Sequence, residues 1–272
     1  MSSIFDDIIE NKKKEIDKRK KSQKYQNFSK IVNENILKNQ YSQYNFVSRI
    51  LKPKVGDIGV IAEVKLKSPS EGPLGFEKDA VSKALSYQNG YADAVSVVVD
   101  EMFFGGSLEL FKNIRKNIGL PMLFKDFIID EFQIQEALYC KADAILLLAK
   151  LDEYYDQDFH DYIQMTNITP IVEVSTEQEL DLSINHVAKV IGVNARDLDT
   201  FEIDVERAEK IIKKVPKDKI VIGFSGVNSR EEVEIYKKAG ARAVLVGTSM
   251  MQSDCPIDLI RSLNGLPHYD KS

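Results

Sequence analysis

Charged side chains stand at the end of one short apolar run, and this placement points to chemistry. The run Val60–Val64 contains Glu63 and is followed directly by Lys65, after which the chain turns at Pro69 to Gly72. An unpaired charge in a dry interior is costly, so Glu63 and Lys65 must reach each other, water or a ligand. We therefore expect the strand formed by this run to end at the opening of a functional site, which we call the mouth.

Polar side chains also follow other apolar runs, at the point where each run ends. They are Lys67 and Ser68 after the first run, then Lys125 with Asp126, Glu173, and Asn194 with Arg196. Each group alone could belong to an ion pair between neighbouring strands. Together, two carboxylates and two lysines form a general acid–base set, because a lysine flanked by carboxylates keeps its proton and an enclosed carboxylate becomes a stronger base.

Two glycine-containing segments indicate a separate anion site. Gly223–Gly226 and Gly247–Ser249 each follow an apolar run late in the chain. Glycine lets backbone amides approach an anion closely, although a glycine can also simply permit a tight turn. The expected phosphate-binding residues are Ser225, Gly226, Gly247 and Thr248.

Strand-like runs alternate eight times with amphipathic helical patterns from Gly59 onward. The predicted strands are 60–65, 93–99, 121–125, 142–148, 169–174, 188–193, 219–224 and 242–246. Eight units favour a closed (β/α)8 TIM barrel over a doubly wound sheet, for which no GxGxxG motif opens a first helix. In such barrels the polar strand ends meet at one face, and the loops after the last two strands often bind phosphate.

Helix boundaries carry their own signals. Capping pairs predict helix starts at Asp130 with Gln133, Thr176 with Glu179, and Ser229 with Glu232. Glycines that should close helices in the left-handed conformation are Gly90, Gly119 and Gly240.

The first 50 residues are predicted to be a helical extension without strands. Ile4, Phe5, Ile8 and Ile9 share one helix face, so this extension should pack on the barrel. We expect residues 1–272 to form one domain, of which 1–50 is the extension. The lysine-rich run Asn11–Lys21 is interpreted as a solvated helix face in preference to a partner-binding patch.

Composition excludes several function classes. A net charge of -5 and a pI near 5.4 argue against a nucleic-acid footprint. No apolar run reaches the roughly 18 residues that span a bilayer, and the amino terminus lacks an export signal, so we expect a cytoplasmic protein without membrane contact. Cys140 and Cys255 have no CxxC or metal-ligand spacing, which agrees with a reducing compartment.

Metal and thiol chemistry are not indicated by the sequence. His160, His186 and His268 are scattered, and none is spaced as part of a ligand pair, so no metal site is expected. Cys140 lies on a helical pattern without an adjacent activating group, as expected of a small core residue.

Several segments in order resemble the indole-3-glycerol phosphate synthase family of tryptophan biosynthesis. They are Ile61–Ser70, Ser96–Asp100 with Phe103–Ser107, Lys125–Asp130 with Gln133–Ile134, Ala142–Leu147, Val172–Val174 and Ile191–Leu198. The resemblance covers nearly the whole chain, including the helical extension. It implies closure of 1-(2-carboxyphenylamino)-1-deoxyribulose 5-phosphate to indole-3-glycerol phosphate, with loss of carbon dioxide and water, and no metal or organic cofactor. Other tryptophan-pathway enzymes are candidate partners.

The resemblance also implies roles for individual residues. Lys125 matches the general acid that protonates the substrate carbonyl, and Glu173 matches the base of the later dehydration. Lys65 would hold the anthranilate carboxylate or assist proton transfer, and Glu63 would orient the lysines. The matching substrate-binding residues are Ser68, Lys67, Asn194 and Arg196, with Ser225, Gly226, Gly247 and Thr248 around the phosphate.

The chain departs from the family pattern at a few positions. Phe224 stands where the family usually has glutamate, immediately before the Ser-Gly pair, so one carboxylate of the mouth is replaced by an apolar ring. Phe124, Val99 and Ser175 stand where arginine, threonine and histidine are frequent. None of these changes removes the assigned acid or base, so we expect retained chemistry with an altered rate or affinity.

Two other functions compete with this interpretation. A phosphoribosylanthranilate isomerase-like enzyme would also be a barrel with a phosphate site, but that family relies on a cysteine where this chain has Glu63-Val64-Lys65. A diverged paralogue that binds a sugar phosphate without turnover is motivated only by Phe224, and intact Lys125 and Glu173 argue against it.

Overall fold

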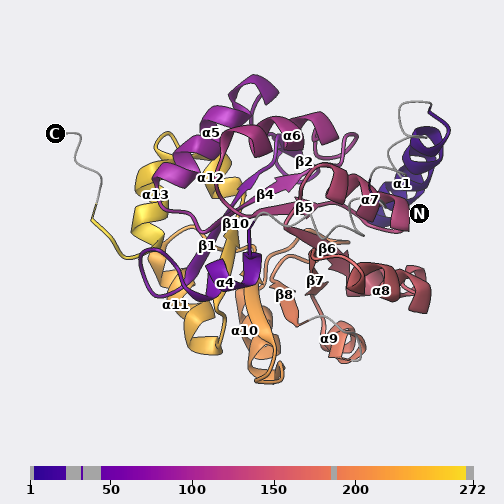
Figure 1. The fold of residues 1–272 in the computed structure, drawn as a ribbon. Helices are drawn as coiled ribbons and strands as arrows, with labels where there is room; N and C mark the ends of the chain where they lie inside the picture. Colours follow the sequence, from indigo (N-terminus) through magenta and orange to yellow (C-terminus); the bar gives the residue numbers. More distant parts are fainter. Residues whose placement is uncertain (1–2, 23–31, 33–43, 185–188, 268–272) are drawn as a thin grey trace.

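The computed structural model describes residues 3–22, 32, 44–184 and 189–267. Within them, eight parallel strands close into a barrel with the neighbour order β1-β10-β9-β8-β7-β6-β5-β4 (Figure 1). The strands are β1 (Gly59–Val64), β4 (Ala94–Val98), β5 (Met122–Lys125), β6 (Ala144–Leu148), β7 (Thr169–Val174), β8 (Val190–Asn194), β9 (Ile220–Phe224) and β10 (Ala243–Val246). The predicted (β/α)8 barrel is confirmed, and each observed strand end lies within two residues of the predicted one.

Helices cover the outside of the barrel (Figure 1). They are α5 (Glu77–Asn89), α6 (Leu108–Asn117), α7 (Glu131–Tyr139), α8 (Gln157–Gln164), α9 (Glu177–Ile184), α10 (Val205–Lys214), α11 (Arg230–Ala239) and α13 (Pro256–Leu263). Every residue of β1, β4, β6, β8 and β10 is buried, because the barrel interior fills one face of these strands and the helices cover the other. Among the described residues, no helix is both long and apolar enough to cross a membrane.

Short elements complete the two ends of the barrel. The hairpin β2 (Lys67–Ser68) and β3 (Gly72–Pro73) follows β1, and the 3-10 helix η1 (Ala149–Tyr154) follows β6. Helix α12 (Thr248–Gln252) follows β10 directly, and α4 (Phe46–Leu51) precedes β1. The loops that form the functional face therefore contain structure of their own.

The predicted helix starts are present, with one difference in detail. Ser229 and Glu232 form a capping box, and the Thr176 hydroxyl accepts from the Glu179 amide at 3.1 Å. Asp130 caps α7, but the Gln133 side chain accepts from the Ile129 amide at 2.8 Å instead of returning to the cap residue.

The predicted helix-closing glycines are only partly correct. Gly240 has a φ of 124° and closes α11 as expected. Gly90 has a φ of -76°, and the left-handed residue after α5 is Tyr91, with a φ of 71°. A Cβ at Gly90 would lie 3.1 Å from the Ile257 Cα, so close helix packing explains this glycine better than a left-handed turn.

The amino-terminal helix α1 (Ile4–Lys20) lies beside α7 and buries Phe5, Ile8, Ile9 and Ile16 (Figure 1). The interpretation of Asn11–Lys21 as a solvated face is wrong for Lys12, which is fully buried among carboxylates. Lysine occupies a core-facing position here because its ammonium meets partners supplied by distant strand ends.

Two aspartates fasten the amino-terminal face of the barrel. Asp93 and Asp143 each stand in an Ala-Asp-Ala triplet immediately before a strand. Asp93 accepts from the Val60 amide at 3.1 Å, and Asp143 accepts from the Met122 amide at 2.8 Å. Each carboxylate therefore connects the residue before its own strand to the backbone of a neighbouring strand. Asp143 also forms an ion pair with buried Arg115 at 3.0 Å.

Replacing Arg115 should destabilise the barrel strongly. Arg115→Met leaves the Asp143 carboxylate buried without its cation, and we expect the free energy of unfolding to fall by about 3 to 5 kcal/mol in urea titrations. Lys116→Met, an exposed change on the same helix, should shift it by less than about 0.5 kcal/mol. Equal effects of the two substitutions would contradict this assignment.

Candidate active site

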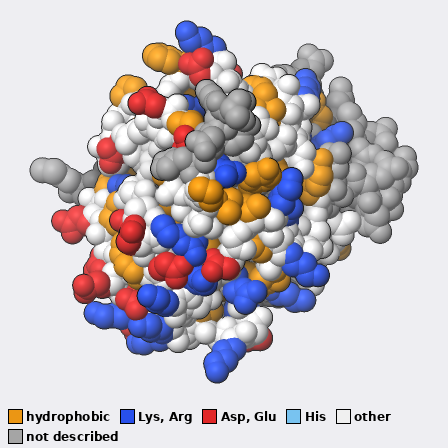
Figure 2. Space-filling model, turned by 90° about the vertical axis from the view of Figure 1, so that its left-hand side faces the viewer, with side chains coloured by type: hydrophobic (Ala, Val, Ile, Leu, Met, Phe, Trp, Pro, Cys, Tyr) orange, Lys and Arg blue, Asp and Glu red, His pale blue; other side chains and the backbone are white. Residues whose placement is uncertain are grey.

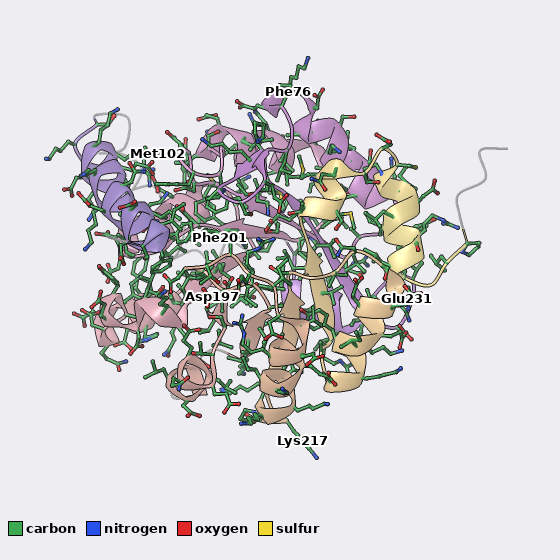
Figure 3. All side chains as sticks on the ribbon, turned by 180° about the vertical axis from the view of Figure 1, so that it is seen from behind. Phe76, Met102, Asp197, Phe201, Lys217 and Glu231 are labelled. Carbon is green, nitrogen blue, oxygen red and sulfur yellow. The ribbon has the colours of Figure 1, made fainter. Side chains whose placement is uncertain are left out.

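The polar strand ends meet around one cavity of about 330 Å³ at the carboxyl ends of the strands. Of the predicted site residues, those that line it are Glu63, Lys65, Ser68, Lys125, Glu173, Asn194, Arg196, Ser225, Gly226, Gly247 and Thr248. Lys67 is the exception: it lies on β2, its amide donates to the Phe104 carbonyl at 3.1 Å, and its side chain is not part of the lining. Phe201 also lines the cavity and is labelled in Figure 3.

Glu63 occupies the centre of the charged group. One carboxylate oxygen lies 3.4 Å from the Lys65 ammonium and the other lies 3.5 Å from the Lys125 ammonium. The Ser96 hydroxyl donates to the second oxygen at 3.3 Å. A Cβ at Gly247 would lie 2.5 Å from the first oxygen, so the glycine at the end of β10 leaves the room that this carboxylate needs.

The ion pairs set the charge state of Glu63 and act differently on the two lysines. Burial opposes the charged form of Glu63, but Lys125 and Lys65 outweigh it and hold the pKa of Glu63 below its ordinary value. Burial lowers the pKa of Lys65, because Glu63 only partly offsets it and the Lys125 and Arg196 cations add to the lowering. The cavity therefore contains one firmly ionised carboxylate and a lysine that gives up its proton more readily than usual.

Lys125 and Glu173 are shifted in the directions that an acid and a base require. Burial disfavours the Lys125 ammonium, yet Glu63 and Glu173 together raise the pKa of Lys125, so it holds its proton. Burial raises the pKa of Glu173 despite Lys125 and despite the Asn194 amide, which donates to it at 2.8 Å. A charged ammonium and a more basic carboxylate thus share one enclosed space.

Asn194 and Arg196 are held by their neighbours at the exit of β8. The Asn194 carbonyl oxygen accepts from the Arg196 amide at 3.0 Å, which fixes the Asn194 amide toward Glu173. The Arg196 guanidinium donates to the Phe201 carbonyl at 3.1 Å and to the Ser70 hydroxyl at 3.2 Å. Arg196 therefore joins the loop after β8 to the loop after β1 across the mouth.

The part of the cavity between the exits of β8 and β1 is built from the exits of β9 and β10. Ser225 and Gly226 have successive positive φ values of 64° and 67°. The Tyr236 hydroxyl donates to the Ser225 carbonyl at 2.9 Å and supports this turn. Thr248 begins α12 directly after Gly247, so small residues and backbone groups line this end of the cavity.

Apolar side chains form another part of the wall. Phe224 is buried, and its ring lies so close to Gly192 that a Cβ there would be 2.7 Å from the Phe224 Cζ. Phe104 and Phe127 lie on another part of the wall, with ring centroids 5.8 Å apart. The cavity can therefore accommodate a ligand with an apolar, planar part next to charged groups.

Sequence reasoning missed Ser96, Ser70 and the ring of Phe104. Ser96 was part of an apolar run, and the only signal was a hydroxyl in a strand that pairs with the strand of Glu63. Ser70 and Phe104 lie in loops, where residue spacing in the sequence does not indicate whether a side chain points toward the cavity. Within the described residues, no group of three or more His, Cys, Asp or Glu is arranged to hold a metal ion. The expectation that no metal or cofactor is needed stays a prediction.

Comparisons with known proteins show which family this chain belongs to. The sequence model of the family described as indole-3-glycerol phosphate synthase matches residues 5–263. An indole-3-glycerol phosphate synthase of Nautilia profundicola is 38% identical over 264 residues, which cover 96% of this chain and 98% of the relative. One from Caldanaerobacter subterraneus subsp. tengcongensis is 36% identical over 251 residues, with 92% and 94% covered.

Solved structures of lower sequence identity share the fold of this chain but do not indicate its function. The solved structure of 3-hexulose-6-phosphate synthase from Salmonella typhimurium superposes with a TM-score of 0.62 at 16% identity, covering 76% of this chain and 97% of that one. Identity this low shows only a shared fold, which many unrelated activities use. The family match and the two close relatives, by contrast, establish that this chain belongs to the indole-3-glycerol phosphate synthase family.

Proposed function

We propose that this cavity closes 1-(2-carboxyphenylamino)-1-deoxyribulose 5-phosphate to indole-3-glycerol phosphate, with loss of carbon dioxide and water, as a carboxy-lyase of tryptophan biosynthesis. The observation that carries the proposal is the placement of Glu63 between Lys65 and Lys125, with Glu173 on the same cavity. It supplies a proton donor and a proton acceptor within one enclosed site, as a condensation followed by a dehydration requires.

In the first step, the Lys125 ammonium protonates the substrate carbonyl oxygen while the anthranilate ring carbon attacks the carbonyl carbon. The raised pKa of Lys125 supports this role, because the group is protonated when the substrate arrives. Loss of carbon dioxide returns the bonding electron pair to the ring. Lys65 holds the anthranilate carboxylate or assists proton transfer, and Glu63 keeps both ammonium groups in place.

In the second step, the Lys65 ammonium donates a proton to the hydroxyl formed from the carbonyl, which leaves as water, while Glu173 accepts a proton from the substrate. The raised pKa of Glu173 makes its carboxylate a better base than an exposed one. Asn194 and Arg196 orient the substrate near Glu173, and Ser68 contacts its anthranilate end. Lys67, which does not line the cavity, has no direct contact with the substrate in this proposal. Ser225, Gly226, Gly247 and Thr248 bind the phosphate, a role that fits the open backbone at the exits of β9 and β10.

We also propose one domain for residues 1–272, with cytoplasmic action on a small phosphorylated substrate and without nucleic acid or membrane. The net charge of -5 supports this proposal, as does the face in Figure 2, where Lys and Arg side chains are interspersed with Asp and Glu. Other tryptophan-pathway enzymes are the partners that this function favours.

The activity is tested by the appearance of indole-product fluorescence from the carboxyphenylamino-ribulose phosphate in metal-free buffer. We expect turnover by the wild type and a fall in kcat of about 10²-fold or more in Lys125→Met, because the proton donor is lost. Lys217→Met, at the exposed periphery of the barrel (Figure 3), should match the wild type. Absence of product from folded wild type would favour the sugar-phosphate-binding paralogue, and an unimpaired Lys125→Met would remove that residue from the mechanism.

Restoring the family glutamate should not harm the enzyme. Phe224→Glu adds a carboxylate to the mouth, and we expect kcat/KM to be preserved or improved in the same assay. Phe224→Gln, which is similar in size and uncharged, separates the effect of the charge from the loss of the ring. A collapse of activity in both variants, with folding intact by circular dichroism, would show that the ring itself has a task in this chain.

A further inference from the structure

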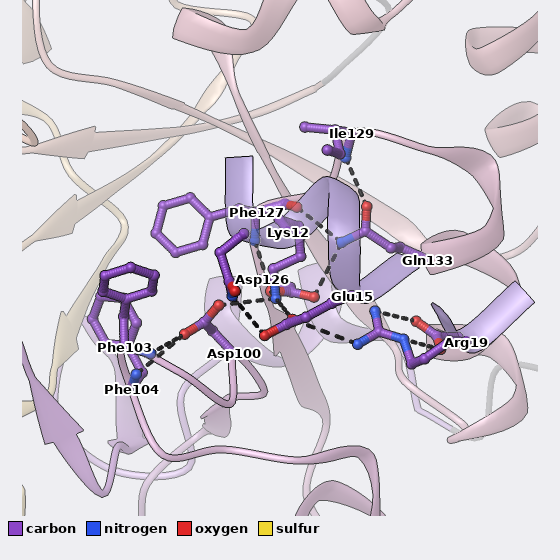
Figure 4. A network of polar contacts seen from close by, with 12 residues as sticks. Lys12, Glu15, Arg19, Asp100, Phe103, Phe104, Asp126, Phe127, Ile129 and Gln133 are labelled. Carbon is purple, nitrogen blue, oxygen red and sulfur yellow. Dashed lines mark hydrogen bonds and ion pairs between the residues drawn. The ribbon is translucent and has the colours of Figure 1, made fainter. Parts of the chain in front are cut away.

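Lys12 of α1 lies outside the cavity but contacts Asp126, which lines it, and Asp100, which follows β4. Its ammonium lies 2.9 Å from an Asp100 oxygen and 2.8 Å from an Asp126 oxygen (Figure 4). Glu15, one turn along α1, lies 3.0 Å from the same ammonium. The Lys12 and Asp100 side chains are fully buried, so this is an interior cluster and not a surface ion pair.

Resting on the function proposed above, we propose that Lys12 is a positioning residue for the reaction. It joins the exits of β4 and β5 and so sets the position of the aromatic wall formed by Phe104 and Phe127. The extension thereby takes part in substrate binding without touching the substrate.

The connection through Asp100 reaches the wall and the hairpin after β1. The second Asp100 oxygen accepts the amides of Phe103 at 2.8 Å and Phe104 at 3.2 Å. The Phe104 carbonyl in turn accepts the Lys67 amide at 3.1 Å, and the Phe104 side chain lines the cavity. A shift of Asp100 would therefore move both the ring and the hairpin.

The connection through Asp126 reaches the other half of the wall. Asp126 directly follows Lys125, and the oxygen that meets Lys12 also accepts the Phe127 amide at 2.9 Å. Its other oxygen accepts the Gln133 side-chain amide at 3.1 Å, which explains why Gln133 does not return to the start of α7. Phe5 of α1 meets the Phe127 ring with centroids 6.1 Å apart, so α1 contacts this wall twice.

Attachment of α1 to the barrel does not by itself require this cluster. Arg19 pairs with buried Glu136 at 2.9 Å, and Lys20 pairs with Asp130 at 2.5 Å. Both partners belong to α7 or its cap, and neither lines the cavity. An ammonium and carboxylates in a dry interior are a poor source of stability compared with apolar packing, so a positional role accounts for Lys12 better than anchoring does.

The position of the wall predicts which kinetic parameter responds. Phe104 and Phe127 offer apolar area to the substrate, and such contacts are the same in the ground state and the transition state. Loss of uniform binding raises KM and leaves kcat nearly unchanged. The proton-transfer groups Glu63, Lys65 and Lys125 pair with one another, whereas the carboxylates that Lys12 meets in the described part of the chain are Glu15, Asp100 and Asp126.

The test compares Lys12→Met with Arg19→Met in the fluorescence assay. We expect Lys12→Met to raise KM about tenfold with kcat within about threefold of the wild type. Arg19→Met breaks a buried ion pair of the same helix and should lower the unfolding midpoint while leaving KM unchanged. An equal rise of KM in both variants, or an unchanged KM in Lys12→Met, would overturn the proposal.

A second variant separates position from stability. Lys12→Met combined with Asp100→Asn and Asp126→Asn removes the unpaired charges and keeps acceptors for the Phe103, Phe104 and Phe127 amides. We expect the triple variant to regain the unfolding midpoint of the wild type while its KM stays raised. If the KM also returned to the wild-type value, Lys12 would have only a structural role. Calorimetric binding of the substrate reduced to its alcohol, which cannot react, gives the same comparison without turnover. A wild type that binds this analogue but makes no product would contradict the proposed function and leave the Lys12 comparison decisive.

Discussion

The candidate active site depends on one carboxylate, Glu63, that forms ion pairs with two ammonium groups. Glu63 is buried at the end of β1 and lies between Lys65, which directly follows β1, and Lys125, the last residue of β5. Since a buried carboxylate without partners is strongly disfavoured, its position fixes those of both lysines. The same contact determines why glycine follows β10, because a side chain at Gly247 would occupy the space of Glu63.

This shared contact gives the two lysines different chemistry. Lys125 faces Glu173 as well as Glu63 and keeps its proton, whereas Lys65 has only one carboxylate to set against burial and two nearby cations. Opposite shifts of neighbouring groups are a common way to place an acid and a base in one site. The opposite pKa shifts of Lys125 and Lys65 indicate that the two lysines have different roles in the reaction of the family.

The barrel and most of the residues that line its cavity could be predicted from the sequence, because their signals are local. Continuous apolar runs reveal buried parallel strands, and polar residues at their ends must meet at one face once the barrel closes. What could not be predicted depends on contacts between distant segments. Lys12 resembled its solvated neighbours because two of the carboxylates that pair with it, Asp100 and Asp126, lie after β4 and β5. Gly90 resembled a turn glycine because α13, which packs on it, lies far along the chain.

The central role of Glu63 is tested most directly by the titration of Lys65 and Lys125. Protein labelled with ¹³C at lysine Cε, with Lys125 and Lys65 assigned through their methionine variants, allows each pKa to be followed by NMR. In the wild type, Lys125 should titrate above the ordinary lysine value and Lys65 below it, and in Glu63→Gln both values should fall. Identical lysine titrations in the wild type and in folded Glu63→Gln would contradict the central role of Glu63.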